Sequence, residues 1–272
     1  MKKRLDILVF EKGLAKSRMW AQSLIMEGCV FVEGQRADKP GMSYPEECRI
    51  EVKKKEVDFV SRGGLKLFKA INVFNINLKN LVALDAGAST GGFTDCMLQN
   101  GCKKVYAIDV GYGQLDWKLR NDKRVINLER TNIRYITKDK IDDEINFFSA
   151  DLSFISLCTV LPAIRQVISK ECRGVCLIKP QFEAGKEKVG KNGVIRDRNV
   201  RIETIQKVIN FCENNGFSVN GLDFSPVKGP KGNIEYLLYI QKSDDAKVSK
   251  NINVDLVESM SFKELSGEEQ NF

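Results

Sequence analysis

From about residue 81 to residue 242 the chain alternates short apolar runs with segments of helical apolar spacing. Helical spacing occurs over roughly 91–101, 113–120, 156–169 and 197–215. Because parallel strands need helical crossovers, this alternation predicts an α/β fold with a doubly wound, mostly parallel sheet. The seven strand-like runs are LVALDA, KVYAID, RVINL, INFFSAD, GVCLIK, FSVNGLDFS and IEYLLYI.

Polar residues recur where these predicted strands begin or end. Right-handed crossovers bring the carboxyl ends of parallel strands to one edge of the sheet, where such folds bind ligands. We therefore expect the functional site at this edge. The five places are 85–92, Asp109, Asp151, Lys179 and Glu235.

The segment LVALDAGASTGGFTDCML (81–98) has the strand–loop–helix layout that binds ligands at a helix N-terminus. Its GASTG stretch matches G-x-S-x-G, the nucleophile elbow of α/β-hydrolases, with Ser89 as the nucleophile. The chain has no histidine to activate this serine, so only a Ser–Lys arrangement would be left. The loop lacks a Walker lysine, and Ser89 occupies the second glycine position of the dinucleotide fingerprint.

The remaining pattern, D-x-G-x-x-x-G-G, suits a ligand without phosphate, because it offers no phosphate-binding lysine. Gly87 allows a turn, whereas Gly91 and Gly92 allow the backbone to approach a ligand closely. Asp109 follows Gly87 by 22 residues (109 − 87), as expected of an acid that binds ribose hydroxyls. Ribose plus an amino-acid moiety describes S-adenosyl-L-methionine, which we favour over a tight turn with solvated carboxylates.

Four charged residues border the predicted strands or the helical segment before them. Such charges are costly next to buried strands unless they are paired, so structural ion pairs are one interpretation. The other is a cluster for methyl transfer to an alcohol, in which a lysine orients or deprotonates the hydroxyl while carboxylates hold the lysines. The four residues are Lys66, Asp151, Lys179 and Glu235.

The chain divides into regions of different character. Residues 1–58 combine the helical SRMWAQSLIMEG with the strand-like CVFVEG and CRIEVK, which predicts a small α+β domain. Residues 59–62 are expected to be a linker and residues 63–242 the main domain. Residues 243–272 are expected to be an acidic, flexible tail.

The net charge of +7 is unevenly distributed. Residues 243–272 carry seven acidic and three basic side chains, a charge of −4, which leaves +11 on residues 1–242. A basic body favours a polyanionic partner, most simply nucleic acid. The eight cysteines form no C-x-x-C pair and no apolar run is long enough to span a bilayer. We expect reduced thiols, no metal site and a cytoplasmic protein.

The chain resembles the TlyA family, whose members are described both as haemolysins and as ribosomal-RNA 2′-O-methyltransferases. The resemblance covers residues 1–242. It implies an N-terminal alpha-L RNA-binding module, like that of a small-subunit ribosomal protein, before a Rossmann-like methyltransferase domain of the heat-shock RNA methyltransferase kind. It rests on RLDILVFEKGLAKSRMWAQSLIMEGCVFVEG, VSRGGLKL, LDAGASTGGFTD, AIDVGYGQLDWKLR, LERTNIR, DLSFISL, LIKPQFEAG and GNIEYLLY.

The resemblance also implies roles for individual residues. Its expected activity is in-line methyl transfer from S-adenosyl-L-methionine to ribose of ribosomal RNA or ribosomal subunits. Nothing in the sequence demands more than a monomer, and we expect no DNA partner. The family's catalytic Lys–Asp–Lys–Glu tetrad falls on Lys66, Asp151, Lys179 and Glu235. Cofactor binding is implied for Asp85, Gly87, Ala88, Ser89, Gly91, Asp109, Glu129 and Asn132.

Basic residues in both domains are candidate RNA contacts, although each could equally be a solvated surface charge. The loop 183–199 follows Lys179, contains glycines and is basic, so we expect a mobile lid that binds substrate. The candidates are Lys12, Lys16, Arg18 and Lys39 in the first domain, and Lys186, Lys188 and Lys191 in the loop.

Two other functions stay open on the sequence. A membrane-active cytolysin calls for an export signal, an amphipathic membrane-binding helix or barrel-forming strands, and we find none of these patterns. A non-enzymatic RNA-binding protein would have no need of the four tetrad residues, which are all present.

Overall fold

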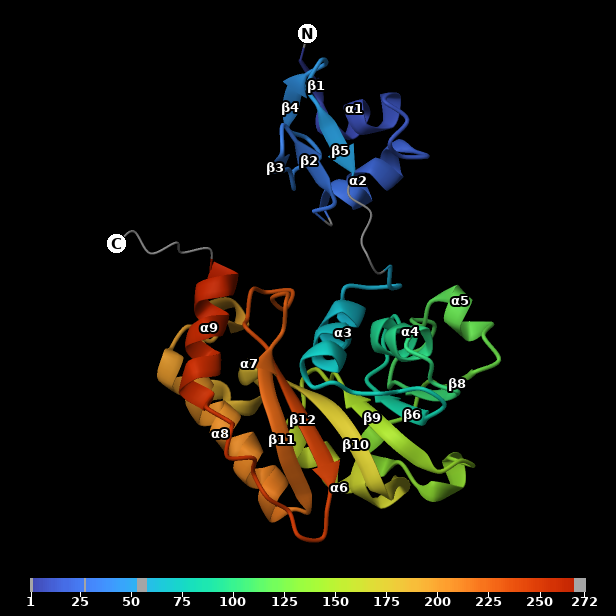
Figure 1. The fold of residues 1–272 in the computed structure, drawn as a ribbon, viewed down its shortest axis with the longest axis vertical. Helices are drawn as coiled ribbons and strands as arrows, with labels where there is room; N and C mark the ends of the chain where they lie inside the picture. The colour runs from blue at the N-terminus through green and yellow to red at the C-terminus, as the bar shows by residue number, and fades with distance from the viewer. Residues whose placement is uncertain (1, 27, 53–57, 267–272) are drawn as a thin grey trace. The chain divides into compact units, whose positions relative to one another are not determined.

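The computed structural model describes residues 2–26, 28–52 and 58–266 (Figure 1). The chain divides into two compact units, Met1–Asp58 and Phe59–Phe272. Each unit has a hydrophobic core of its own.

The smaller unit is an α+β domain. Two antiparallel sheets are described, β1–β4 and β3–β2–β5. The Ser17 hydroxyl accepts a hydrogen bond from the backbone N–H of Trp20 at 3.1 Å, which caps the second helix. The elements are β1 (Lys2–Arg4), α1 (Leu5–Glu11), α2 (Arg18–Met26), β2 (Val30–Val32), β3 (Gln35–Arg36), β4 (Ser43–Pro45) and β5 (Ile50–Val52).

The larger unit contains a seven-stranded sheet in the order β11-β12-β10-β9-β6-β7-β8. The five strands from β10 to β8 are mutually parallel, and β12 is antiparallel to both of its neighbours. The sheet is therefore mostly parallel, as expected. The strands are β6 (Val82–Ala86), β7 (Lys104–Ile108), β8 (Val125–Leu128), β9 (Ile145–Ala150), β10 (Ile168–Ile178), β11 (Phe217–Phe224) and β12 (Tyr236–Lys242).

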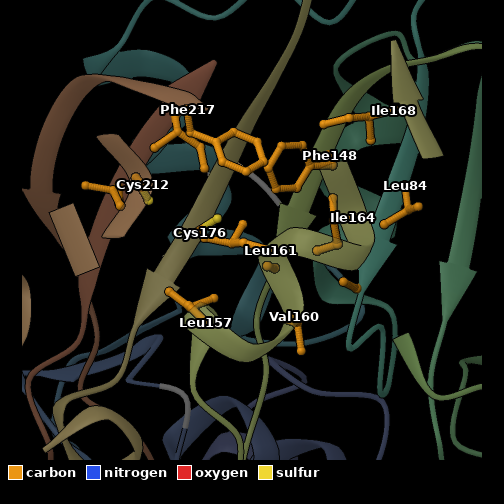
Figure 2. Packing of buried hydrophobic residues seen from close by; sticks show 14 of the residues in the cluster. Leu84, Phe148, Leu157, Val160, Leu161, Ile164, Ile168, Cys176, Cys212 and Phe217 are labelled. Atoms are coloured by element: carbon orange, nitrogen blue, oxygen red, sulfur yellow. The ribbon is translucent and has the colours of Figure 1, made fainter. Parts of the chain in front are cut away.

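Helices cover both faces of this sheet, because neighbouring strand residues point to opposite faces. Phe147 belongs to the core on the face of α3 and α4, whereas Phe148 belongs to the core on the face of α6 and α8. Figure 2 shows Phe148 packed near Leu161, Ile164 and Phe217 in the second core. The α-helices are α3 (Gly63–Val73), α4 (Gly92–Gln99), α5 (Trp117–Arg120), α6 (Leu157–Val167), α7 (Pro180–Glu183), α8 (Arg198–Asn214) and α9 (Val254–Ser266).

Strand register brings distant residues to one edge of the sheet. Ala86 pairs with Ala150, so the loop after β6 lies beside the residues that follow β9. Ile178 pairs with Tyr236. Because β12 runs in the opposite direction, its first residues meet the last residues of β10 at the same edge.

Two predicted boundaries differ from the structure. The expected helix 113–120 is helical only over Trp117–Arg120, because Asp116 is the N-cap and accepts a hydrogen bond from the Lys118 N–H at 2.8 Å. The strand that contains GVCLIK begins at Ile168, within the helix predicted over 156–169.

The prediction of a flexible tail over 243–272 is wrong for the described residues. Lys247 and Ser249 form backbone hydrogen bonds with Val219 of β11, and α9 then packs against α8 and β11. Val257 and Leu265 contact the core, and Glu258 is buried against Arg201. The acidic composition of this region did not predict a packed helix, because Glu258 looks like a solvent-exposed charge in the sequence. Only the structure shows that it points inward and pairs with Arg201. Residues 267–272 lie outside the described residues.

Candidate active site

The glycine loop after β6 is tightly fitted to its surroundings. Gly87 has φ +85°, and a Cβ at this position would lie 2.6 Å from the backbone oxygen of Asp151. Gly91 also has a positive φ, +94°, as the residue before α4. Ser89 adopts a positive φ of 48° without being glycine. This backbone therefore needs Gly87 and Gly91 and holds the loop in a strained, specific shape.

Asp85 lies beneath the loop and is fully buried at the end of β6. Its carboxylate accepts hydrogen bonds from the Thr94 hydroxyl (2.6 Å) and the Ser149 hydroxyl (2.9 Å). Burial raises the pKa of Asp85 to about 6, although these hydrogen bonds oppose the rise. Its two bonds connect α4 and β9 to β6, so Asp85 supports the loop from below.

The acid at the end of the next strand holds the loop from the side. Asp109 accepts hydrogen bonds from the backbone N–H groups of Ser89 (2.8 Å) and Gly111 (2.7 Å). The Ser89 hydroxyl donates a 3.4 Å hydrogen bond to the Gln114 side-chain oxygen, and no basic side chain within residues 2–26, 28–52 and 58–266 is found as its partner. This geometry offers no activated serine nucleophile.

The two cofactor candidates that follow β8, Glu129 and Asn132, both form hydrogen bonds with nearby residues. Glu129 accepts a hydrogen bond from the Gly113 N–H at 2.8 Å and pairs with Arg120. Asn132 accepts from the Arg134 N–H at 3.1 Å and caps a short 3₁₀ turn. Both follow β8 and lie farther along the sheet edge than the glycine loop.

The four predicted tetrad residues lie together. Lys66 Nζ lies 2.7 Å from Glu235 Oε2 and 3.7 Å from Asp151 Oδ2. Lys179 Nζ lies 2.6 Å from Asp151 Oδ1. Asp151 therefore joins the two lysines, and Glu235, only 1% exposed, holds Lys66 from inside the protein.

A cleft of about 300 Å³ connects this cluster to the glycine loop. Its lining includes Gly87, Ala88 and Ser89 together with Lys66, Asp151 and Lys179, while the buried Glu235 contributes no lining. Several lining residues were not predicted from the sequence, among them the basic Arg62 and Lys228. Another is Ser153, whose hydroxyl accepts a hydrogen bond from Lys179 Nζ at 3.2 Å.

The candidate RNA contacts fall into two groups. Arg18 pairs with the buried Asp6 at 3.0 Å, Lys188 pairs with Glu203, and Lys16 lies over the Trp20 ring. The others are exposed, and the ion pairs found within the described residues do not include them. These others are Lys12, Lys39, Lys186 and Lys191.

Comparisons with known proteins agree with this architecture. Residues 59–242 match the FtsJ-like methyltransferase family, and residues 3–47 match the S4 domain. The chain is 43% identical over 247 residues to the 16S/23S rRNA (cytidine-2′-O)-methyltransferase TlyA of Mycobacterium tuberculosis, covering 90% of this chain and 92% of that protein. It is 44% identical over 237 residues to Hemolysin A of Brachyspira hyodysenteriae, covering 87% and 98%.

A solved structure from Streptococcus thermophilus, named as a hemolysin, matches 98% of both chains with a TM-score of 0.78 and 42% identity. The fold and the glycine loop beside the lysine–carboxylate cluster define the class, an S-adenosylmethionine-dependent methyltransferase. Within this class the chain belongs to the TlyA family, which joins an S4 domain to an FtsJ-like methyltransferase domain.

The residues present fit S-adenosylmethionine. The loop lines the cleft at Gly87, where a side chain would collide with the backbone oxygen of Asp151. Asp109 stands at the end of β7, the position from which an acid reaches ribose hydroxyls in this fold. The loop itself carries no phosphate-binding lysine, which agrees with a cofactor that has no phosphate.

Proposed function

We propose that this protein methylates ribose 2′-hydroxyl groups of ribosomal RNA, in the cytoplasm and as a monomer. One observation carries the proposal: the glycine loop and both lysines of the Lys66–Asp151–Lys179–Glu235 cluster line the same cleft. Methyl transfer requires a cofactor site and a hydroxyl-orienting site within bonding distance of each other. The S4 domain and the rRNA methyltransferase activity in the name of the Mycobacterium tuberculosis relative support RNA as the substrate.

The proposed chemistry assigns distinct tasks to the four residues. Bound S-adenosylmethionine supplies an electrophilic methyl group. Lys179 would contact the substrate oxygen and direct the oxygen's lone pair toward that methyl group, and the oxygen's proton would pass to the Lys179–Asp151 pair. The new C–O bond would replace the methyl–sulfur bond, whose electron pair stays with the sulfur of the departing neutral thioether. Lys66 holds Asp151 from the other side, and Glu235 fixes Lys66 through the buried 2.7 Å contact.

RNA binding is assigned to both units. In the S4 domain the candidates are Lys12, Lys16, Arg18 and Lys39, of which Arg18 also serves the Asp6 ion pair. In the larger unit the candidates are Lys186, Lys188 and Lys191 of the loop after α7, together with Arg62 and Lys228, which line the cleft. Phosphates near the target ribose would meet these cations.

The test is methyl transfer from labelled cofactor to purified ribosomal subunits and to protein-free ribosomal RNA. We expect label on RNA with the wild-type protein and at least about 1,000-fold less with Lys179→Ala. Protection of one phosphodiester bond from alkaline cleavage then maps the 2′-O-methyl group. Label on bases, or no label on RNA with correctly folded protein, would overturn the proposal.

A membrane assay separates this function from the one implied by the name Hemolysin A. Among the described residues, no helix is long and apolar enough to cross a membrane. We expect no dye release from phosphatidylcholine–phosphatidylglycerol vesicles at protein concentrations that saturate methyl transfer. Lysis that persists in Lys179→Ala would show a separate membrane activity.

A further inference from the structure

The C-terminal helix α9 lies beyond residues 59–242, which match the methyltransferase family. Figure 1 shows α9 beside α8. Its Glu258 is 1% exposed and accepts a hydrogen bond from Arg201 Nε of α8 at 2.9 Å. Burying an ion pair is not in itself stabilising relative to apolar packing, so this pair calls for another explanation.

Arg201 also donates hydrogen bonds to the backbone of a neighbouring segment. Its Nη1 donates to the backbone oxygens of Ile195 (3.3 Å) and Arg196 (2.9 Å). Both residues lie near the C-terminal end of the basic segment 184–197, which follows α7. Glu258 therefore orients Arg201, and Arg201 fastens the end of that segment.

Asn233 fastens the same segment from the other side. It is 3% exposed, its side-chain oxygen accepts from the Ile195 N–H (2.9 Å), and its side-chain amide donates to the Gly193 oxygen (2.8 Å). Its backbone oxygen accepts from the Gly229 N–H at 2.9 Å. A Cβ at Gly229 would lie 2.5 Å from Glu235 Oε1, so this loop is packed directly against the tetrad carboxylate.

We propose that Asn233 is a positioning residue for the methyl-transfer site, and that the Glu258–Arg201 pair of α9 and α8 braces it. The network joins the basic segment 184–197 to the loop 225–234, which carries Lys228 and leads into Glu235. Through this network, α9 influences the geometry of Glu235 and of Lys228, which lines the cleft. This inference rests on the proposed function for its kinetic consequences, but its structural part stands independently.

The test compares Asn233→Ala, Asn233→Asp and Glu258→Gln in the full-length protein. Asn233→Asp keeps the acceptor for Ile195 and loses the donor to Gly193. We expect kcat for RNA methylation to fall about tenfold in Asn233→Ala and by less in the other two, because small displacements of reacting groups are costly. The cofactor Kd should stay within about twofold, since the glycine loop lies outside the network.

A matched control distinguishes bracing from a general loss of stability. Asp245→Asn removes an exposed ion pair with Lys247 in the segment before α9 and touches neither Arg201 nor Glu258, so it should leave kcat unchanged. The double variant Asn233→Ala/Glu258→Gln should lose less than the product of the single effects, because both act on one network. Multiplicative effects, or equal losses in the control, would overturn the proposal.

Amide hydrogen exchange supplies a readout that does not depend on catalysis. Asn233→Ala and Glu258→Gln should each speed exchange at 193–196 and 229–235 by at least about tenfold, since fewer contacts hold these amides. If the exchange rates of these amides in both variants match those of the wild type, the proposed bracing is wrong. If the wild-type protein methylates no RNA but exchange accelerates as expected, the proposed function fails and the brace survives.

Discussion

Asp6 in the smaller unit and Asp151 in the larger unit are both carboxylates held by two cations, yet their surroundings differ. Asp6 is fully buried and accepts hydrogen bonds from Arg4, Arg18 and Gln22. Asp151 has a side chain that is 18% exposed, and both of its lysines line the cleft. The first cluster is saturated by its own unit, whereas the second still offers lysine donors to a ligand.

The charges of the Asp6 cluster therefore stabilise the fold, whereas those of the Asp151 cluster are available to a substrate. Burial alone would raise the pKa of Asp6, but the hydrogen bonds from Arg4, Gln22 and Arg18 outweigh burial and hold its pKa well below the usual range. Such a carboxylate is fixed in its charged form at any ordinary pH. Breaking either cluster should therefore produce a loss of a different kind.

The largest effect is expected at the cleft. Glu235→Gln keeps the shape of the side chain but removes the charge that pairs with Lys66, so kcat for methyl transfer should fall about 100-fold. Single-turnover assays with labelled cofactor measure this, with the cofactor Kd as the control. A kcat within threefold of the wild type would show that Lys66 does not need this partner.

Breaking the saturated cluster should instead cost stability. Asp6→Ala leaves Arg4 and Arg18 without their carboxylate partner and should lower the free energy of unfolding of the smaller unit by about 2 kcal/mol. This value is below that for a fully buried ion pair, because solvent screens the half-exposed arginines. Urea unfolding followed by Trp20 fluorescence in a Trp117→Phe background measures it. Methyl transfer to a short RNA should not change.

The sign of the pH dependence follows from the depressed pKa of Asp6. Its contribution is present above the unfolded-state pKa of about 4 and is lost as pH falls further. The difference in stability between wild type and Asp6→Ala should therefore shrink below about pH 4. A constant difference down to strongly acidic pH would show that packing, not charge, explains the effect.

Asp85 represents a third situation, a buried carboxylate with hydroxyl partners. Its folded-state pKa of about 6 exceeds the unfolded value of about 4, so the folded protein binds an extra proton between these values and stability falls as pH rises through this range. Asp85→Asn should remove about 3 kcal/mol of this pH dependence. Trp117 fluorescence in a Trp20→Phe background measures it, and an unchanged slope would contradict the assignment.

The smallest effects are expected at two serines. Ser153→Ala removes the hydroxyl that accepts from Lys179 and should lower kcat about threefold without changing the cofactor Kd. Ser89→Ala should do the reverse, weakening cofactor binding about threefold at constant kcat. If Ser89→Ala alone abolished turnover with cofactor bound, the loop would hold a catalytic serine after all.

The sequence predicted the sheet and the meeting of the four charged residues because apolar periodicity and strand-end charges are local signals. Boundaries such as the start of β10 at Ile168 were missed, since ISKECR mixes charges into an exposed strand end. Residues whose role depends on a distant partner gave no local signal. Glu258 and Asn233 are of this kind, because each is explained by backbone or side-chain atoms contributed from another part of the chain.

The reversed direction of β12 has a consequence for synthesis of the protein. Lys66 and Glu235 lie 169 residues apart, and Glu235 reaches the cleft edge only when β12 pairs with β10. A nascent chain that ends before this strand can already contain a complete S4 domain, since domains fold as units during translation. We expect such a chain to bind RNA without modifying it, so methylation ability arises only when the last strand of the sheet has been translated and inserted.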